Sequence, residues 1–241
     1  MISKLIYVLA IFFALSACAA GNHTSSTADT APPPKSEALT TMQSLSTVSI
    51  EELERRTANG DTQAQAELGA RYGNGNGVEQ DLDKAIALFR DAAAKGEADA
   101  AFYLGMANLS GMGVPSNEAN AVMWLEKAAA NGSAQGQYWL AVMIKDGRGG
   151  ISPNWEAAVP YLWKSAMQGY EDAEFLLGYA YQEGLGVEKN PEAAAYWYRL
   201  TNQRAYNMRA NYNLALMIKA EEIEWQPGDP EQLKPGYTQN R

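Results

Sequence analysis

A Leu-Gly or Leu-Ala dipeptide, followed in most cases by a Gly-x-Gly-Val segment, recurs along this chain at a nearly constant interval. The repeated leucines are 36, 36, 37 and 37 residues apart, at Leu68, Leu104, Leu140, Leu177 and Leu214. A period of about 20–50 residues is typical of a stack of small repeated units. Such a stack presents a long face to another macromolecule, without a central cavity of converging polar groups. The period therefore constrains the fold and favours binding over catalysis.

Each unit has the pattern of two helices. In the first unit, apolar residues at four-residue intervals predict a helix over residues 62–72, which the glycines of residues 73–77 end. A second helix is predicted over residues 83–94, with Gly96 in the left-handed conformation after it. Ahead of the first unit, a capping box at Ser49 predicts a short leading helix.

Two polar residues that precede prolines predict the starts of later second helices. Asn190 stands before Pro191, and Ser152 stands before Pro153. An N-cap residue followed by proline at the first helical position is a common helix start. Both pairs are therefore predicted to begin a helix.

The unit resembles the Sel-one-like repeat, a relative of the tetratricopeptide repeat. The residues that carry the resemblance read AELGARYGNGNGVEQDLDKAIALFRDAAAKG from Ala66, AFYLGMANLSGMGVPSNEANAVMWLEKAAANG from Ala101, EFLLGYAYQEGLGVEKNPEAAAYWY from Glu174 and ANYNLALMI from Ala210. The resemblance implies an all-α fold, a right-handed α-solenoid of helix-turn-helix repeats. Residues 48–225 are expected to hold a leading helix, four full repeats and a terminal capping helix that runs on to Glu224.

The third unit departs from the pattern at two places. It carries one extra residue in the loop that contains Gly150, and Pro160 falls inside its second helix. An interior proline removes one backbone hydrogen bond and kinks a helix. The pattern leaves two interpretations open, a functional bend and a tolerated irregularity.

The N-terminus has the pattern of an export signal. A basic start, an apolar run of residues 5–15 and a small-residue end describe a signal peptide over residues 1–17. The segment Leu-Ser-Ala-Cys ending at Cys18 resembles the lipobox of bacterial lipoproteins, which implies that Cys18 is lipidated. Ala19 after it implies the outer membrane. Residues 18–47 are rich in Ser, Thr and Pro and are expected to form a disordered tether, and residues 226–241 a flexible tail.

The charge balance restricts the class of partner. The chain carries 28 acidic and 19 basic residues, a net charge of −9, and loss of residues 1–17 would make it −10. Nucleic acid binding needs a basic surface, so nucleic acid is not an expected partner. A protein partner, basic or a toxin, fits this charge better. Contact with the membrane is expected only through the lipid anchor.

The sequence offers few groups for chemistry. The only histidine, His23, lies in the tether, and the only cysteine is assigned to the lipid. This pattern predicts no catalytic residue, no metal site and no cofactor. The glycine clusters follow helices instead of strands and lack a Gly-Lys-Ser/Thr signature, so they are predicted to be turns. The carboxylates Glu171, Asp172, Glu174 and Glu183 are predicted to lie on a solvated helix face.

Two positions in each first helix are expected to form a strip. By resemblance to tetratricopeptide arrays, the positions two residues before and two residues after the repeated leucine line the concave surface. In the last four units this strip consists of Phe102, Met106, Tyr138, Val142, Phe175, Tyr179, Tyr212 and Leu216. A strip of apolar and aromatic side chains is typical of a binding surface. The same side chains could instead only pack neighbouring first helices together.

Three functions remain after these exclusions. The leading hypothesis is a non-enzymatic scaffold, anchored in the bacterial envelope, that binds a protein on the strip. An alternative is a periplasmic immunity protein against a secreted lipase-type effector, because lipoproteins with these repeats resemble such factors. A hydrolase of the cysteine-rich, β-lactam-binding branch is a weaker alternative, since that branch carries one disulfide in each unit and this chain has a single cysteine.

Overall fold

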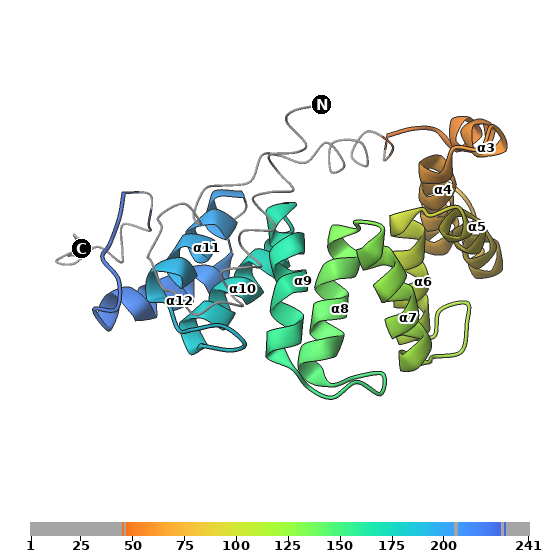
Figure 1. Cartoon of the computed structure of the whole chain (residues 1–241). Helices are drawn as coiled ribbons and strands as arrows, with labels where there is room; N and C mark the ends of the chain where they lie inside the picture. Colours follow the sequence, from red (N-terminus) through yellow and green to blue (C-terminus); the bar gives the residue numbers. More distant parts are fainter. Residues whose placement is uncertain (1–44, 46, 205–206, 228, 230–241) are drawn as a thin grey trace, which may run out of the picture. The chain divides into compact units, whose positions relative to one another are not determined.

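The structure of this chain is a computed structural model, and it describes residues 45, 47–204, 207–227 and 229. The expected signal peptide, the lipidation site at Cys18, most of the tether and the end of the tail lie outside the described residues. Figure 1 shows helices following one another as stacked pairs. Their bounds are α3 Ile50–Ala58, α4 Thr62–Asn74, α5 Leu82–Ala94, α6 Ala98–Ser110, α7 Glu118–Ala130, α8 Ala134–Asp146, α9 Trp155–Met167, α10 Glu171–Glu183, α11 Pro191–Arg204 and α12 Met208–Lys219.

The helix pairs confirm the predicted all-α repeat solenoid. Helices α4 and α5, α6 and α7, α8 and α9, and α10 and α11 form four pairs, and each second helix contacts the first helix of the next pair. We call α4, α6, α8, α10 and α12 the first-helix layer and α5, α7, α9 and α11 the second-helix layer. Direct contacts also join α4 with α6 and α6 with α8. No helix in the described part of the chain is long and apolar enough to span a membrane.

The glycine after the repeated leucine lets the two helices of a pair approach closely. A Cβ atom at Gly105 would lie 2.9 Å from Cγ and Cδ2 of Leu125. The same atom would lie 2.7 Å from the Phe89 ring at Gly69, and 2.8 Å from the Tyr198 ring at Gly178. The large side chain of the second helix therefore occupies the space that a side chain on the first helix would need.

The two glycines of the Gly-x-Gly-Val segment have different roles. The first, such as Gly111, ends the first helix in the left-handed conformation, with φ of 76°. The second, such as Gly113, has φ of 70° and lies against the preceding second helix, where a Cβ would be 2.9 Å from Ile86 and 3.2 Å from the Leu82 carbonyl oxygen. The first glycine thus ends a helix within its own unit, and the second allows close contact with the preceding unit.

The third unit absorbs its extra residue in the loop before α9. Gly149 and Gly150 both have positive φ, but only Gly149 approaches the preceding unit, where the Glu118 carboxylate accepts a hydrogen bond from its N–H at 3.1 Å. The same carboxylate accepts a hydrogen bond from Arg148 Nε at 3.0 Å. Pro160 lies on the exposed side of α9, which continues through it to Met167.

One predicted helix start is confirmed and one is wrong. Asn190 Oδ1 accepts a hydrogen bond from the Ala193 N–H at 2.9 Å, and α11 begins at Pro191 as expected. In the third unit, α9 begins at Trp155 instead of Pro153, because Asn154 is the N-cap and its Oδ1 accepts from the Ala157 N–H at 3.0 Å. Asparagine at the N-cap satisfies a free helical N–H without any need for proline after it.

The ends of the repeat region differ from their predicted bounds. Leu45, assigned by sequence to the tether, is 1% exposed and packs in a cluster with Leu53 and Leu68. At the other end, α12 stops at Lys219 and does not continue as a helix to Glu224. The chain then turns back, and Asp229 in the expected flexible tail is buried. The packed region is therefore longer at both ends than residues 48–225.

Candidate functional site

The strip residues divide into two groups by burial. Phe102, Met106, Tyr138, Val142 and Phe175 are half-buried, whereas Tyr179, Tyr212 and Leu216 are exposed. The exposed members all belong to α10 and α12, the last two helices of the first-helix layer. The predicted strip is thus not uniform along the stack, and its accessible part lies at the C-terminal end.

The half-buried aromatic residues pack against the core of the array. Phe102 packs on a cluster that spans two units, with Leu125 on α7 of its own unit and Leu140 on α8 of the next. The Tyr138 ring lies 5.1 Å from the Tyr170 ring, and the Phe175 ring lies 5.7 Å from the Tyr198 ring, measured between centroids. Aromatic pairs at these distances contribute to stability beyond their buried area. Phe102, Tyr138 and Phe175 therefore take part in packing within the array.

Exposed apolar side chains gather on α10 and α12. Among the described residues, six large apolar side chains are exposed, and four of these lie on the two helices: Tyr179 at 37%, Met208 at 74%, Tyr212 at 63% and Leu216 at 43%. Residues 208, 212 and 216 are four apart, so they share one face of α12. Among the described residues, α12 is the last helix of its layer.

A shallow hollow of about 510 Å³ lies between α10 and α12. It is lined from α10 by Phe175, Leu176 and Tyr179, and from α12 by Met208, Arg209, Tyr212 and Asn213. Three strip residues therefore meet in one hollow, and the remaining exposed strip residue, Leu216, lies one turn beyond Tyr212. We call this place the α10–α12 hollow.

Sequence reasoning did not identify Met208 or Arg209. The strip rule considered only the positions two residues on either side of Leu214, and Met208 lies six residues before it. The sequence signal that could have identified them was the absence of a recognisable second helix after α12. An apolar Met-Tyr-Leu series at four-residue intervals on a terminal helix predicts an exposed stripe.

Arg209 supplies the charge at the edge of the hollow. Its guanidinium carbon lies 4.4 Å from the centre of the Phe175 ring, and one N–H donates to Asp172 Oδ1 at 3.1 Å. Burial, together with the Asp172 carboxylate, raises the pKa of Tyr138 to about 12. The phenol, which is neutral at physiological pH even at the ordinary tyrosine pKa of about 10, therefore also stays protonated in more alkaline solution. The edge of the hollow combines a paired cation with aromatic rings.

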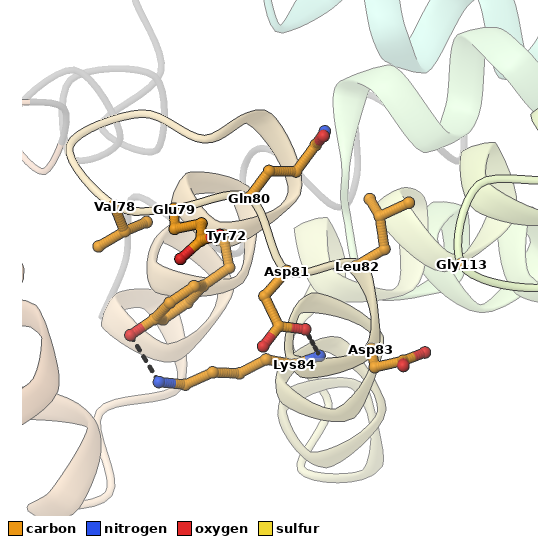
Figure 2. Close-up of a pocket in the computed structure, with 9 residues that line it drawn as sticks. All are labelled: Tyr72, Val78, Glu79, Gln80, Asp81, Leu82, Asp83, Lys84 and Gly113. Atoms are coloured by element: carbon orange, nitrogen blue, oxygen red, sulfur yellow. Dashed lines mark hydrogen bonds between the residues drawn. The ribbon is translucent and has the colours of Figure 1, made fainter.

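A second, larger hollow of about 920 Å³ lies in the first unit, beside the loop between α4 and α5 (Figure 2). Its polar groups take part in local structure: Lys84 Nζ donates to the Tyr72 hydroxyl and lies 3.8 Å from the centre of that ring, and Asp81 caps α5. Tyr72 in turn donates to Glu54 on α3 at 3.2 Å. This hollow is an open surface feature whose side chains hold the loop in place.

Within the described residues, no group of three or more His, Cys, Asp or Glu side chains is placed to hold a metal ion. The carboxylates of Glu171 and Glu183 are exposed, as predicted. Glu174 is fully buried within α10, so the prediction of a solvated face is wrong for this residue. A helical position that faces the neighbouring helices is buried whatever its residue type.

The repeat family model for the Sel1 repeat matches residues 62–97, 98–133, 134–170 and 171–201, more than half of the chain. The chain belongs to the Sel1 repeat family. The four matches coincide with the four helix pairs from α4 to α11. Comparison with curated proteins gave no match.

Solved structures support the same assignment. A protective antigen of uropathogenic Escherichia coli strains, which has an SLR fold, is 34% identical over 72% of this chain, with a TM-score of 0.66. This chain covers only 37% of that antigen. A Sel1 repeat protein from Oxalobacter formigenes is 29% identical and matches 73% of this chain and 72% of its own, with a TM-score of 0.64.

An immunity protein has a more distantly similar structure. The immunity protein Pa5087 from Pseudomonas aeruginosa is 18% identical to this chain, with a TM-score of 0.50. The similarity covers 88% of this chain and 84% of Pa5087. At this identity the comparison supports a shared fold.

Proposed function

We propose that this Sel1 repeat protein is a non-enzymatic scaffold that binds a protein partner on its first-helix layer. The observation that carries the proposal is that, among the described residues, four of the six exposed large apolar side chains lie on α10 and α12, on one layer of the solenoid. Exposed apolar patches of this kind mark protein interfaces. The aromatic residues among them are also the types most enriched at interface centres.

The direct test uses exposed residues, since loss of the half-buried ones would also disturb packing. A partner retained from an envelope extract is identified, purified, and titrated against the chain in solution. The double variant Tyr179→Ala with Leu216→Ala is expected to weaken its binding at least tenfold, because anchor side chains at an interface each contribute about 2 kcal/mol.

The matched control is the double variant Met112→Ala with Met123→Ala. These two side chains are 53% and 41% exposed, comparable to the test pair, but Met112 lies in a loop and Met123 in the second-helix layer. Binding should be unchanged in the control, and both double variants should keep the unfolding midpoint of the parent chain. Equal loss of binding in the two double variants would contradict the proposal that the partner binds on the first-helix layer.

The proposal includes a lipid anchor that places the protein at the outer membrane, facing the periplasm. It rests on the lipobox-like segment at Cys18, which follows the apolar run of residues 5–15. Two features accompany this placement: a Ser/Thr/Pro-rich segment between the anchor and the repeats, and a single cysteine in the chain. The Ser/Thr/Pro-rich segment gives the repeat region reach from the membrane surface.

Substitution of Cys18 by serine tests the anchor. The variant is expected to lose incorporation of radiolabelled palmitate and to move from the membrane fraction to the soluble fraction, because serine has no thiol for the acyl transfer. Immunoblotting of fractionated cells measures both forms at once, with an unrelated lipoprotein as the fractionation control. Palmitate labelling of the serine variant at the parent level would overturn the assignment.

A second candidate function is immunity against a secreted toxin. It is favoured by the similarity to Pa5087, which extends over most of both chains, and by the net charge of −9, which suits rapid capture of a basic protein. If the identified partner is a lipase-type effector, an equimolar amount of this chain should abolish its hydrolysis of phospholipid. Full hydrolysis of phospholipid by the effector in the stoichiometric complex would reject the immunity function, and only the scaffold function would remain.

A further inference from the structure

The described residues that follow α12 lead away from the α10–α12 hollow. After α12 the chain turns toward α11, where the Asp229 carboxylate accepts two hydrogen bonds from Arg199, at 2.7 Å from Nε and 2.8 Å from Nη2. Arg199 also donates to the Glu224 carbonyl oxygen at 3.0 Å. Asp229 is buried, so this contact fixes the returning segment on the second-helix layer. The hollow opens on the first-helix layer, between α10 and α12.

The charges around the hollow are arranged along α10. Glu171, Phe175, Tyr179 and Glu183 are four residues apart, so they form one stripe with a carboxylate at each end. The two carboxylates are exposed, and twelve residues of helix place them about 18 Å apart. Between them lies the apolar lining of the hollow.

The cation of the lining does not reverse this pattern. Arg209 is paired with Asp172, one turn before Phe175 and Leu176 on α10. Its positive charge is therefore offset locally. The other cation on this face of α12 is exposed Lys219, seven residues after Tyr212, so Glu171, Asp172 and Glu183 exceed the two cations by one charge. An occupant of the hollow meets an apolar centre with an excess of negative charge around it.

A second copy of this chain is a poor occupant. Each chain carries a net charge of −9, and a two-fold contact through α10 and α12 would bring the acidic ends of both copies together. Like charges at an interface cost several kcal/mol. The apolar area would favour self-association, but the surrounding charge opposes it.

We propose that the α10–α12 hollow binds a basic amphipathic segment of the partner protein. A large apolar side chain of this segment fills the space between Tyr179 and Tyr212, and Lys or Arg residues on either side of it lie near Glu171 and Glu183. The inference rests on the proposed function and adds to it the location of the main anchor and the chemistry of the partner.

The test uses defined peptides as probes. One is a short helical peptide of leucine and lysine with all leucines on one face, and the other has every lysine replaced by glutamate. The fluorescein-labelled peptides are titrated with the purified full chain and followed by fluorescence anisotropy. The lysine peptide should bind at least tenfold more tightly than the glutamate peptide, and added salt should weaken its binding.

Three variants locate the binding. Tyr212→Asp should lower the affinity for the lysine peptide at least tenfold. Met112→Asp, at a similarly exposed apolar residue of the second unit, should leave this affinity unchanged. The double charge reversal Glu171→Lys with Glu183→Lys should invert the preference between the two peptides. All the substituted residues are exposed, so each variant should keep the unfolding midpoint of the parent chain.

Each other outcome contradicts the inference in a different way. Equal affinity for the two peptides, no measurable binding, or no effect of Tyr212→Asp would overturn it. Sedimentation equilibrium that shows a dimer sensitive to Tyr212→Asp would make a second copy the occupant. A tenfold gain in peptide affinity on deletion of residues 230–241 would make the chain's own tail the occupant.

The result is separable from that of the proposed function. If Tyr179→Ala with Leu216→Ala abolishes capture of the native partner while Tyr212→Asp leaves the lysine peptide unaffected, the first-helix layer binds the partner but the hollow does not accept a basic segment. If the lysine peptide behaves as expected while the native partner tolerates the double variant, the scaffold proposal fails at this surface.

Discussion

Replacement of Gly105 by leucine is expected to lower the free energy of unfolding by about 3 kcal/mol. Gly105 is buried where α6 approaches α7, and even a methyl group there would lie 2.9 Å from Leu125 and 3.5 Å from the Ala121 carbonyl oxygen. Leu125 is fully buried, so it cannot turn out into solvent to make room. Leucine adds three further carbon atoms, so the two helices must separate to accept it.

Urea unfolding followed by far-ultraviolet circular dichroism measures this change. The control is leucine at Asn120, an exposed position in α7, which should shift the free energy of unfolding by no more than about 0.5 kcal/mol. Both variants introduce leucine into a helix, one at a buried position and the other at an exposed position. Coincident unfolding curves for the two variants would show that α6 and α7 separate without cost.

The helix pairs could be predicted because every unit obeys the same local rules. The first two helices were expected over residues 62–72 and 83–94 and are found at Thr62–Asn74 and Leu82–Ala94. Spacing, caps and glycines each identify the same boundaries, and the repetition supplies several independent copies of the pattern. The start of α9 was misplaced because the rule favoured Ser152 before proline over Asn154, although either side chain can cap a helix.

Exposure along the strip could not be predicted from the same rules. Phe102, Tyr138, Phe175 and Tyr212 occupy one position of the repeat, yet only Tyr212 is exposed. The difference arises from the neighbour in space, since each of the first three is covered by the unit that follows. A residue's position within its own repeat does not contain this information, but its position within the array does.

Contacts at the two ends were also beyond the sequence pattern. Leu45 reaches the core across the leading helix, and Asp229 pairs with Arg199 thirty residues earlier. Neither contact follows a helical period or a turn motif. Both side chains were assigned to loose segments because composition describes the average behaviour of a segment and not the one residue that packs.

The largest contrast between adjacent residues is expected at Gly149 and Gly150. Both have positive φ, 68° and 87°, so alanine at either position carries a similar backbone cost of about 1 kcal/mol or more. At Gly149 an added Cβ would lie 2.6 Å from Val122 and 2.8 Å from the Glu118 carbonyl oxygen, whereas at Gly150 it would meet no atom within 4 Å. Gly149→Ala should therefore be less stable than Gly150→Ala by about 2 kcal/mol.

The difference reports on the contact between the second and third units. Arg148 in the same loop forms an ion pair with Glu118 at the start of α7. The two side chains are 39% and 42% exposed, so this pair contributes little to stability on its own. In a repeat array, the coupling between neighbouring units keeps unfolding cooperative. Gly149→Ala should thus broaden the urea transition or divide it in two, while Gly150→Ala should keep one transition of parental width. Two variants of equal stability and equal width would show that this loop does not couple the units, and that the contacts of α7 with α8 hold them together alone.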